Sequence, residues 1–147
     1  MLTNNLSIDD AIDVMAQLPQ QELPLQHFFS PGIYVRHMII PAQTMVVGKR
    51  HRKTTLNIFI SGDMSLILSD GTLGERVQGP MIFNSEPNVR KVLYTHTDCV
   101  FLNIHPNEDD EKDFEILEKK YIITDEEYNE LIANNCKKAV NTCHGEW

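Results

Sequence analysis

Basic side chains gather in one short run, Gly-Lys-Arg-His-Arg-Lys at positions 48–53. If this run is a β-strand, its odd-numbered side chains (Lys49, His51, Lys53) share one face and the even-numbered ones share the other. At most about half of the charges can then enter an enclosed pocket. Concentrated basic charge is typical of anion-binding proteins. The run therefore predicts an anion-binding strand; the alternative is a strand end exposed to solvent.

Histidine supplies the candidate acid–base chemistry. His51 is a candidate general base, because imidazole titrates near neutrality and flanking cations favour its neutral form. The alternative is a structural hydrogen bond, and the sequence identifies no acid–base partner for His51. Three further histidines are spread over the predicted β region, without the close spacing of metal ligands: His37, His96 and His105.

Arg90 and Lys91 are adjacent on a predicted strand, so one must point inward and the other outward. We expect Arg90 to point inward, where its planar guanidinium would suit a carboxylate or phosphate. The alternative is an ion pair with an acid such as Glu86.

The chain has 147 residues, 41% of them apolar and 23% charged, which suits one globular domain. It contains no apolar run long enough to cross a membrane, and its acidic N-terminus is unlike a signal peptide. Three widely spaced cysteines favour neither a disulfide framework nor a zinc site, and we expect a cytoplasmic protein: Cys99, Cys136 and Cys143.

Charge is strongly segregated along the chain. Residues 108–130 hold eleven acidic and three basic side chains, and 3 − 11 = −8 equals the net charge of the whole protein. Residues 30–107 hold eight basic and five acidic side chains, or 8 − 5 = +3. This balance argues against a general nucleic-acid binder. The acidic block is interpreted as a solvated helical face or as a cover for basic surface on a neighbouring subunit.

Turns and hydrophobic periodicity predict the elements that position these residues. A helix over 8–18, capped by Ser7, precedes a proline-rich connector over 19–32. Short strands follow, with tight turns at Gly62-Asp63 and Asp70-Gly71: 33–40, 43–47, 56–61, 64–69, 73–77, 81–84, 89–95 and 98–105. An acidic helix over 107–120 and a second helix capped by Thr124 complete the chain. Many short strands without intervening helices predict a sandwich or barrel.

Two segments resemble the cupin superfamily, which consists of small jelly-roll barrels with an internal ligand pocket. Residues 40–71, with Pro41-Ala42 and Gly62, resemble the first cupin motif, and residues 74–106 resemble the second. The resemblance implies a cupin-like double-stranded β-helix over 33–106. It would be flanked by an N-terminal helix and connector (1–32) and an acidic helical extension (107–147). It also implies a homodimer.

The resemblance also places the family's metal-ligand positions at Lys49, His51, Thr55 and either Arg90 or Ser85. Metal ions are bound by neutral imidazoles and anionic carboxylates, and cations at ligand positions oppose metal binding. The same cations suit an anion. We therefore expect no metal and no cofactor. The predicted ligand-binding residues are Lys49, His51, Thr55, Asn57 and Arg90.

Four functions are compatible with this sequence. The preferred prediction is a module that binds a small anion, such as a nucleotide, sugar phosphate or carboxylate, without metal. A metal-independent sugar-nucleotide isomerase or epimerase using His51, a metal-dependent enzyme such as a dioxygenase, and a protein-interaction scaffold are the alternatives. Whether the protein is an enzyme is left open.

Overall fold

The computed structural model describes residues 8–68 and 71–144, and for 136–144 it describes the backbone alone. The predicted Ser7 cap and Asp70 of the second turn lie outside the described residues. No helix in the described part of the chain is long and apolar enough to span a membrane.

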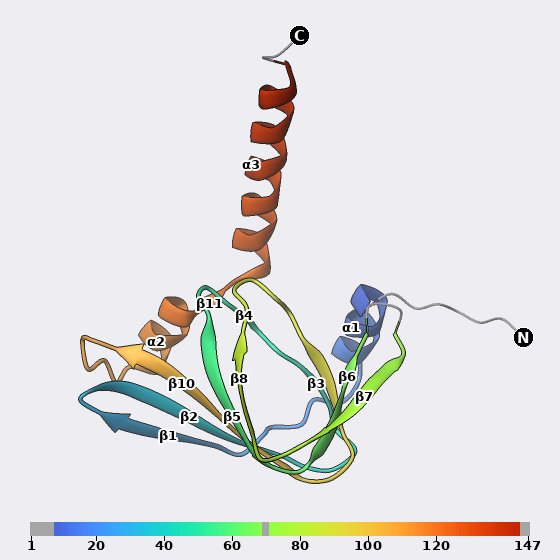
Figure 1. Cartoon of the computed structure of the whole chain (residues 1–147), viewed down its shortest axis with the longest axis vertical. Coiled ribbons are helices and arrows are strands. Elements are labelled where there is room, and N and C mark those ends of the chain that lie inside the picture. Colours follow the sequence, from blue (N-terminus) through green and yellow to red (C-terminus); the bar gives the residue numbers. More distant parts are fainter. Residues whose placement is uncertain (1–7, 69–70, 145–147) are drawn as a thin grey trace, which may run out of the picture.

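Two antiparallel sheets face each other around the interior of the molecule (Figure 1). The larger sheet contains, in spatial order, β1 (Leu25–Ser30), β2 (Gly32–Ile40), β10 (Cys99–Asn107), β5 (Thr55–Ser61) and β8 (Met81–Ser85). The smaller contains β3 (Met45–Val47), β9 (Val92–Thr95), β6 (Asp63–Ile67) and β7 (Leu73–Gln78). A short ladder joins β4 (Arg50–His51) to β11 (Ile122–Ile123).

The chain crosses repeatedly between the two sheets: β2 leads to β3, β5 to β6, β7 to β8 and β9 to β10. This connectivity is that of a jelly roll. The predicted fold class, a cupin-like jelly-roll barrel with helices at both ends of the chain, is therefore confirmed.

Gly62 makes the tight turn between β5 and β6. Its φ of +116° is one that other residues rarely adopt. A Cβ atom there would lie 2.5 Å from the backbone oxygen of Asp98 and 2.6 Å from Sγ of Cys99. Glycine at this position lets the two sheets close at the end of the barrel away from the helices.

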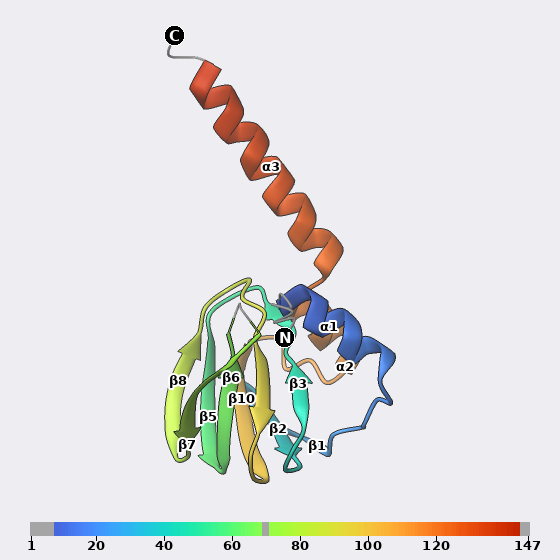
Figure 2. The same cartoon turned by 90° about the vertical axis from the view of Figure 1, so that its right-hand side faces the viewer.

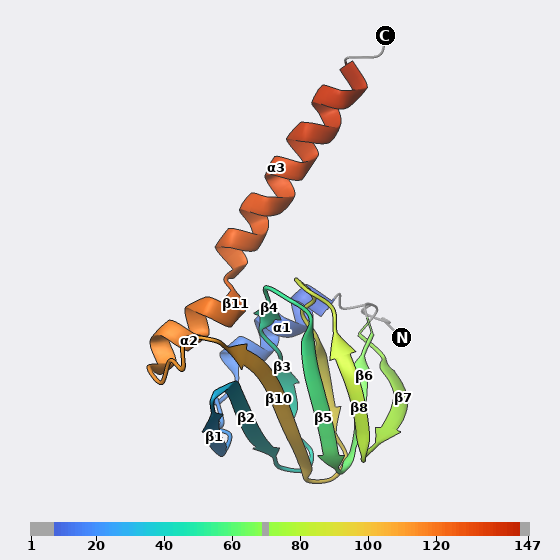
Figure 3. The ribbon, with the colours of Figure 1, turned by 60° about the vertical axis from the view of Figure 1, so that its left-hand side comes forward.

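Three helices flank the barrel. The first, α1 (Ile8–Gln17), has no fully buried side chain. The second, α2 (Phe114–Tyr121), is capped by Asp113, which accepts hydrogen bonds from two backbone N–H groups, and is anchored by the buried Leu117. The third, α3 (Asp125–His144), directly follows Thr124, whose hydroxyl accepts a hydrogen bond from the Glu127 N–H at 3.2 Å, as predicted. In Figures 2 and 3, α3 runs away from the barrel.

Two local predictions need correction. The connector over 19–32 contains β1, which pairs with β2 along its whole length. The helix expected from residue 107 begins at Phe114, because β10 continues to Asn107. The Asn107 side chain then bonds the backbone of Glu111 in both directions, at 2.9 and 3.2 Å, and closes a turn before the helix.

Candidate ligand-binding site

A polar layer crosses the inner face of the larger sheet. Arg36 of β2 is the cross-strand partner of Asn103 of β10, and Asn103 is also the partner of Asn57 of β5. The side-chain amide of Asn103 donates to the side-chain oxygen Oδ1 of Asn57 at 2.6 Å, and the side-chain amide of Asn57 donates to the Ser85 hydroxyl at 2.8 Å. The layer therefore extends over four adjacent strands.

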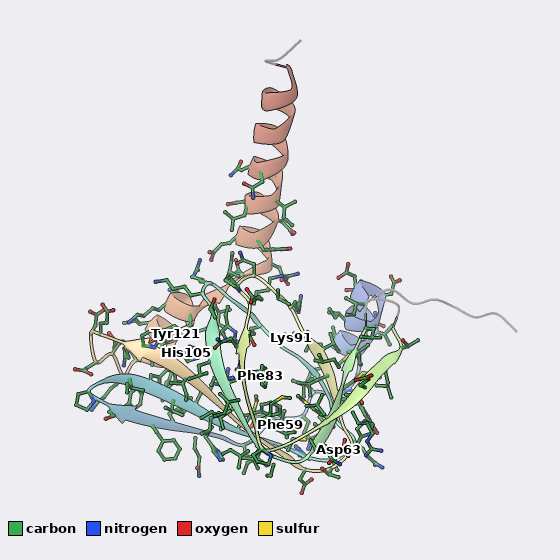
Figure 4. The ribbon with its side chains drawn as sticks, in the orientation of Figure 1. Phe59, Asp63, Phe83, Lys91, His105 and Tyr121 are labelled. Carbon is green, nitrogen blue, oxygen red and sulfur yellow. The ribbon has the colours of Figure 1, made fainter. Side chains whose placement is uncertain are left out.

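An apolar layer lies two residues further along each strand. Met38, Phe101 and Phe59 are its cross-strand partners. The rings of Phe59 and Phe101 stack with centroids 4.4 Å apart and planes within 6°. The buried core continues behind them with Ile40, Met64 and Cys99. Figure 4 shows Phe59 near the barrel end remote from the helices, with Lys91 and His105 toward the helical end.

A cavity of about 340 Å³ lies inside the barrel, between these layers and the smaller sheet. Apolar side chains of both sheets form most of its wall, including Met38, Met64, Phe83, Leu93 and Phe101. Its polar lining consists of Arg36, Lys49, His51, Asn57, Ser85, Lys91 and Asn103. No Asp or Glu side chain of the described residues lines it. The cavity is therefore apolar over most of its wall and cationic at its polar end.

Two cations of this lining form no ion pair with an acidic side chain of the described residues, although Glu118 of α2 interacts electrostatically with Arg36. Arg36 makes no hydrogen bond or ion pair there. Lys91 donates only a long hydrogen bond, 3.4 Å, to the Ser85 hydroxyl, and its ammonium lies 5.3 Å from the centroid of the Phe83 ring. Both donors are thus available to a ligand.

A second cavity, of about 310 Å³, lies beneath α2 and shares Arg36, Lys49 and His51 with the first. Aromatic rings line it: Tyr34 stacks on His105 and on Tyr121 with planes 20° apart in each case. Burial raises the pKa of both tyrosine hydroxyls, so they stay protonated at neutral pH. Arg36, Lys49 and His51 thus stand where the two cavities meet.

The histidines of the site are neutral. Burial, with added repulsion from Arg36 and Lys91, lowers the pKa of His51. Burial, with His51 and Arg36 beside it, lowers the pKa of His105 to about 4. The two rings lie 5.5 Å apart between centroids. At neutral pH the positive charge of the site therefore comes from Arg36, Lys49 and Lys91.

The predicted ligand-binding residues divide in the structure. Lys49, His51 and Asn57 line the barrel cavity, although Lys49 is also paired with Glu118 of α2. Thr55 is buried beside Asn57, where its carbonyl accepts a hydrogen bond from the Asn57 amide at 3.0 Å, but it lines neither cavity. The strand in the basic run covers only Arg50–His51, and Lys53, expected on the same face as Lys49 and His51, lines neither cavity.

Arg90 does not point into the barrel, contrary to expectation. Its guanidinium lies 3.1 Å from the Asp125 carboxylate, at the start of α3, and it lines neither cavity. Its neighbour Lys91 takes the inward position instead. The partner is an acid, as in the alternative interpretation, but it is Asp125 rather than Glu86.

Arg50 and Arg52 of the basic run are paired with the acidic extension. Arg50 lies 2.5 Å from Asp125 and 4.0 Å above the ring of Tyr128. Arg52 donates two hydrogen bonds to Glu127, at 2.6 and 3.0 Å. The acidic block thus covers basic strand residues of its own chain, and it brings α2 and α3 against β4.

Arg36, Lys91 and Asn103 line the cavity but are not among the site residues predicted from the sequence. Arg36 could have been found from strand parity, because it shares the inner face of β2 with Met38 and Ile40. A lone charge on an apolar strand face is a recognisable signal. Asn103 could have been found in the same way, because it shares the inner face of β10 with Phe101.

The three histidines considered for metal binding lie apart. His105 is in the second cavity, His96 bonds the Ser65 hydroxyl at 2.8 Å, and His37 packs edge-on against Phe28. Among the described residues, no three His, Cys, Asp or Glu side chains come close enough together to hold a metal ion.

No protein-family model matches the sequence, and no curated protein matches it. Solved structures do show similarity. A cupin-2 domain protein from Shewanella frigidimarina is 11% identical, with a TM-score of 0.45, over 66% of this chain and 92% of that one. A cupin domain from Bordetella pertussis is 14% identical, with a TM-score of 0.47, over 61% of this chain and 98% of that one.

A third similar structure is a cupin family protein with a double-stranded β-helix fold from Methanocaldococcus jannaschii. It is 15% identical, with a TM-score of 0.45, over 60% of this chain and 84% of that one. The fold itself follows from the strand order given above, with β2-β10-β5-β8 facing β3-β9-β6-β7. This chain has the jelly-roll barrel fold that characterises the cupin superfamily.

Proposed function

We propose that the protein binds a small anionic ligand inside the barrel, without a metal ion, through Arg36 and Lys91. The observation that carries this proposal is Arg36, which lines the barrel cavity, where no described acidic side chain lies, and makes no hydrogen bond or ion pair among the described residues; Glu118 of the second cavity interacts with it only electrostatically. A partly buried cation without a counter-charge is unfavourable. A carboxylate or phosphate would supply that charge, and guanidinium can bind either through two parallel hydrogen bonds.

The polar lining supports binding to an anion rather than to a metal ion. Arg36 and Lys91 lie close enough to His51 to lower its pKa, and Lys49 lines the same cavity. A divalent cation between them would meet like charge at short range, which is strongly unfavourable at moderate dielectric. An anion would meet Arg36, Lys91 and the amide of Asn103, together with Lys49, whose ammonium is paired with Glu118.

Thermal shift measurements with acetate, inorganic phosphate and AMP, at constant ionic strength, test this proposal. We expect at least one anion to raise the melting temperature of the wild-type protein, and Arg36→Gln and Lys91→Gln to reduce the shift. Arg90→Gln is the matched control, since it removes a guanidinium that lines neither cavity, and it should respond like wild type. No stabilisation by any anion, or equal losses in Arg36→Gln and Arg90→Gln, would refute the proposal.

A metal-independent isomerase or epimerase is the second candidate, because a neutral His51 shares the cavity with Arg36 and Lys91. A neutral imidazole can remove a proton next to a carbonyl, and the cations would stabilise the resulting enolate. Deuterium exchange from solvent into a keto-sugar nucleotide, lost in His51→Ala, would support this activity. Absence of exchange in wild type would exclude it for that substrate. A dioxygenase, a scaffold role and a cytoplasmic location stay predictions.

We also propose that two copies of the chain pair through the outer face of the larger sheet. The outward positions of β2, β10 and β5 carry no Asp, Glu, Lys or Arg. Cross-strand register makes this face continuous, since Val35 neighbours Ile104 and Ile104 neighbours Leu56. Six of its apolar side chains are 37–69% exposed: Phe28, Ile33, Ile39, Leu56, Ile60 and Ile82.

The size of this face fits a dimer. Each of the six side chains contributes about 1 kcal/mol when its exposed half is buried. For two copies the sum is about 12 kcal/mol, comparable with the ~4–15 kcal/mol that association costs. A two-fold pairing of one self-complementary face is the commonest arrangement of soluble oligomers.

Light scattering during gel filtration tests the pairing. A protein concentration of ~10–100 µM detects dimers that dissociate in the micromolar range. We expect a dimer for wild type and a monomer for Ile82→Glu. Leu73→Glu is the matched control, because Leu73 is 53% exposed on the opposite sheet, and it should stay dimeric. A monomeric wild type, or dissociation by both variants, would refute this interface.

A further inference from the structure

The distribution of polar and apolar groups in the barrel cavity specifies the kind of anion that fits. This step rests on the proposed anion site. The cations and amides belong to one layer of the sheet, with Arg36, Asn103 and Asn57 in register. The layer of Met38, Phe101 and Phe59 follows on the same strands. Two residues along a strand correspond to about 7 Å, so the polar and apolar ends of the cavity are spatially distinct.

The apolar part of the wall offers no hydrogen bonds. Side chains from both sheets close it, and the described lining contains Met, Leu, Ile, Val and Phe beyond the polar layer, including Met38, Met64, Leu93 and Phe101. The hydroxyl groups of a sugar placed there would lose their bonds to water without replacement, which is unfavourable. A hydrocarbon group placed there would be stabilised by leaving water.

The dimensions allow a ligand with both parts. A volume of about 340 Å³ is in the lower range of ligand pockets. From Arg36 to the buried Ile40 on β2 the strand advances four residues, or roughly 13 Å. An anionic head at Arg36 therefore leaves depth for a short chain or a ring, and little more, before the closed end at Ile40.

We infer that the ligand is an amphipathic carboxylic acid of medium size, with its carboxylate at Arg36 and Lys91 and its hydrocarbon group in the apolar part of the barrel. Arg36 holds the carboxylate through its planar fork, and Lys91 adds a second positive charge. The hydrocarbon group lies against Met38 and the stacked pair of Phe59 and Phe101. The same geometry disfavours sugar phosphates and nucleotides, whose bodies are polar.

A homologous series of straight-chain carboxylates, from acetate to decanoate, tests this inference by titration calorimetry. Each added methylene should raise the affinity about fourfold, corresponding to ~0.8 kcal/mol per buried methylene, until the cavity is filled. Beyond that length the affinity should level off or fall. Octanol and octylamine test the head group, and both should bind at least tenfold more weakly than octanoate.

Variants separate the two halves of the site. Arg36→Gln should weaken binding of octanoate at least tenfold, and Arg90→Gln should leave it unchanged. Val77→Phe fills the apolar wall from β7 and should reduce the gain per methylene. Leu73→Phe, on the same strand but outside the cavity, is its control.

The outcomes distinguish failure of the amphipathic ligand from failure of the proposed anion site. If acetate, phosphate or AMP binds through Arg36 and longer chains bind no more tightly, the amphipathic ligand is refuted and the anion site stands. If octanol binds as well as octanoate, the anionic head is refuted, and the anion site with it. If wild-type protein binds none of these compounds, both proposals are refuted.

Discussion

Replacing His105 by glutamine should remove a large part of the acid sensitivity of the protein. The imidazole is buried in the second cavity, stacked on Tyr121 with ring centroids 4.3 Å apart, beside His51 and Arg36. Burial and these neighbours lower its pKa from 6.5 to about 4. The unfolded chain therefore takes up a proton at a pH where the folded protein does not.

The sign and size of the effect follow from this difference. The free energy of unfolding rises with pH wherever the unfolded state binds more protons than the folded state. Above about pH 6.5 His105 is neutral in both states, so the full stability is present. As the pH falls from 6.5 toward 4, only the unfolded state takes up the proton, and the free energy of unfolding decreases. At ~1.4 kcal/mol per pKa unit, the difference between 6.5 and about 4 corresponds to roughly 3 kcal/mol.

Urea denaturation at intervals from pH 8 to pH 4.5 measures the effect. The free energy of unfolding of wild type should fall more steeply below pH 6.5 than that of His105→Gln. Parallel curves for wild type and His105→Gln would refute the reasoning, because they would show that His105 is protonated at the same pH in both states.

Three further predictions concern the cavity and the barrel. Glu118→Gln removes the acidic partner of Lys49, so the affinity for phosphate should rise up to about fivefold in calorimetry, and a lower affinity would contradict the proposed role of Lys49. Gly62→Ala should destabilise the fold by about 1–3 kcal/mol more than Gly32→Ala in urea denaturation. Both glycines have positive φ, but a Cβ atom meets backbone only at Gly62. Phe59→Ala should cost about 3–5 kcal/mol in the same assay, and a loss below ~1 kcal/mol would show that the aromatic pair is not part of a packed core.

The barrel could be predicted from the sequence because local signals agree with the final fold. Gly62-Asp63 separates two alternating strands, and the structure places the turn there. β1 was missed because prolines at 24 and 31 flank it and give the segment the composition of a connector. Its pairing with β2 is a tertiary contact, which local composition does not encode.

The candidate site was harder to predict because strand faces alternate with every residue. Choosing Arg90 rather than Lys91 is an error of one position, and one position reverses the side of the sheet. The segment before β9 has no alternating apolar pattern that would fix its parity, since Arg90 and Lys91 stand directly before Val92. On β2, by contrast, Met38 and Ile40 define the inner face and identify Arg36 as inward-facing.

The distribution of ion pairs explains how an acidic protein can present a cationic cavity. Asp125 and Glu127 of α3 pair with Arg50, Arg52 and Arg90 on the outside of the barrel. Neither carboxylate pairs with Arg36 or Lys91, which line the cavity, and Glu118 of α2 interacts with Arg36 only electrostatically, without a hydrogen bond among the described residues. Because exposed ion pairs are screened by salt while a partly buried charge is screened much less, recognition at Arg36 should depend on short-range contact. Selectivity among anions would then come from what fills the apolar part of the cavity, since the charge itself is common to all of them.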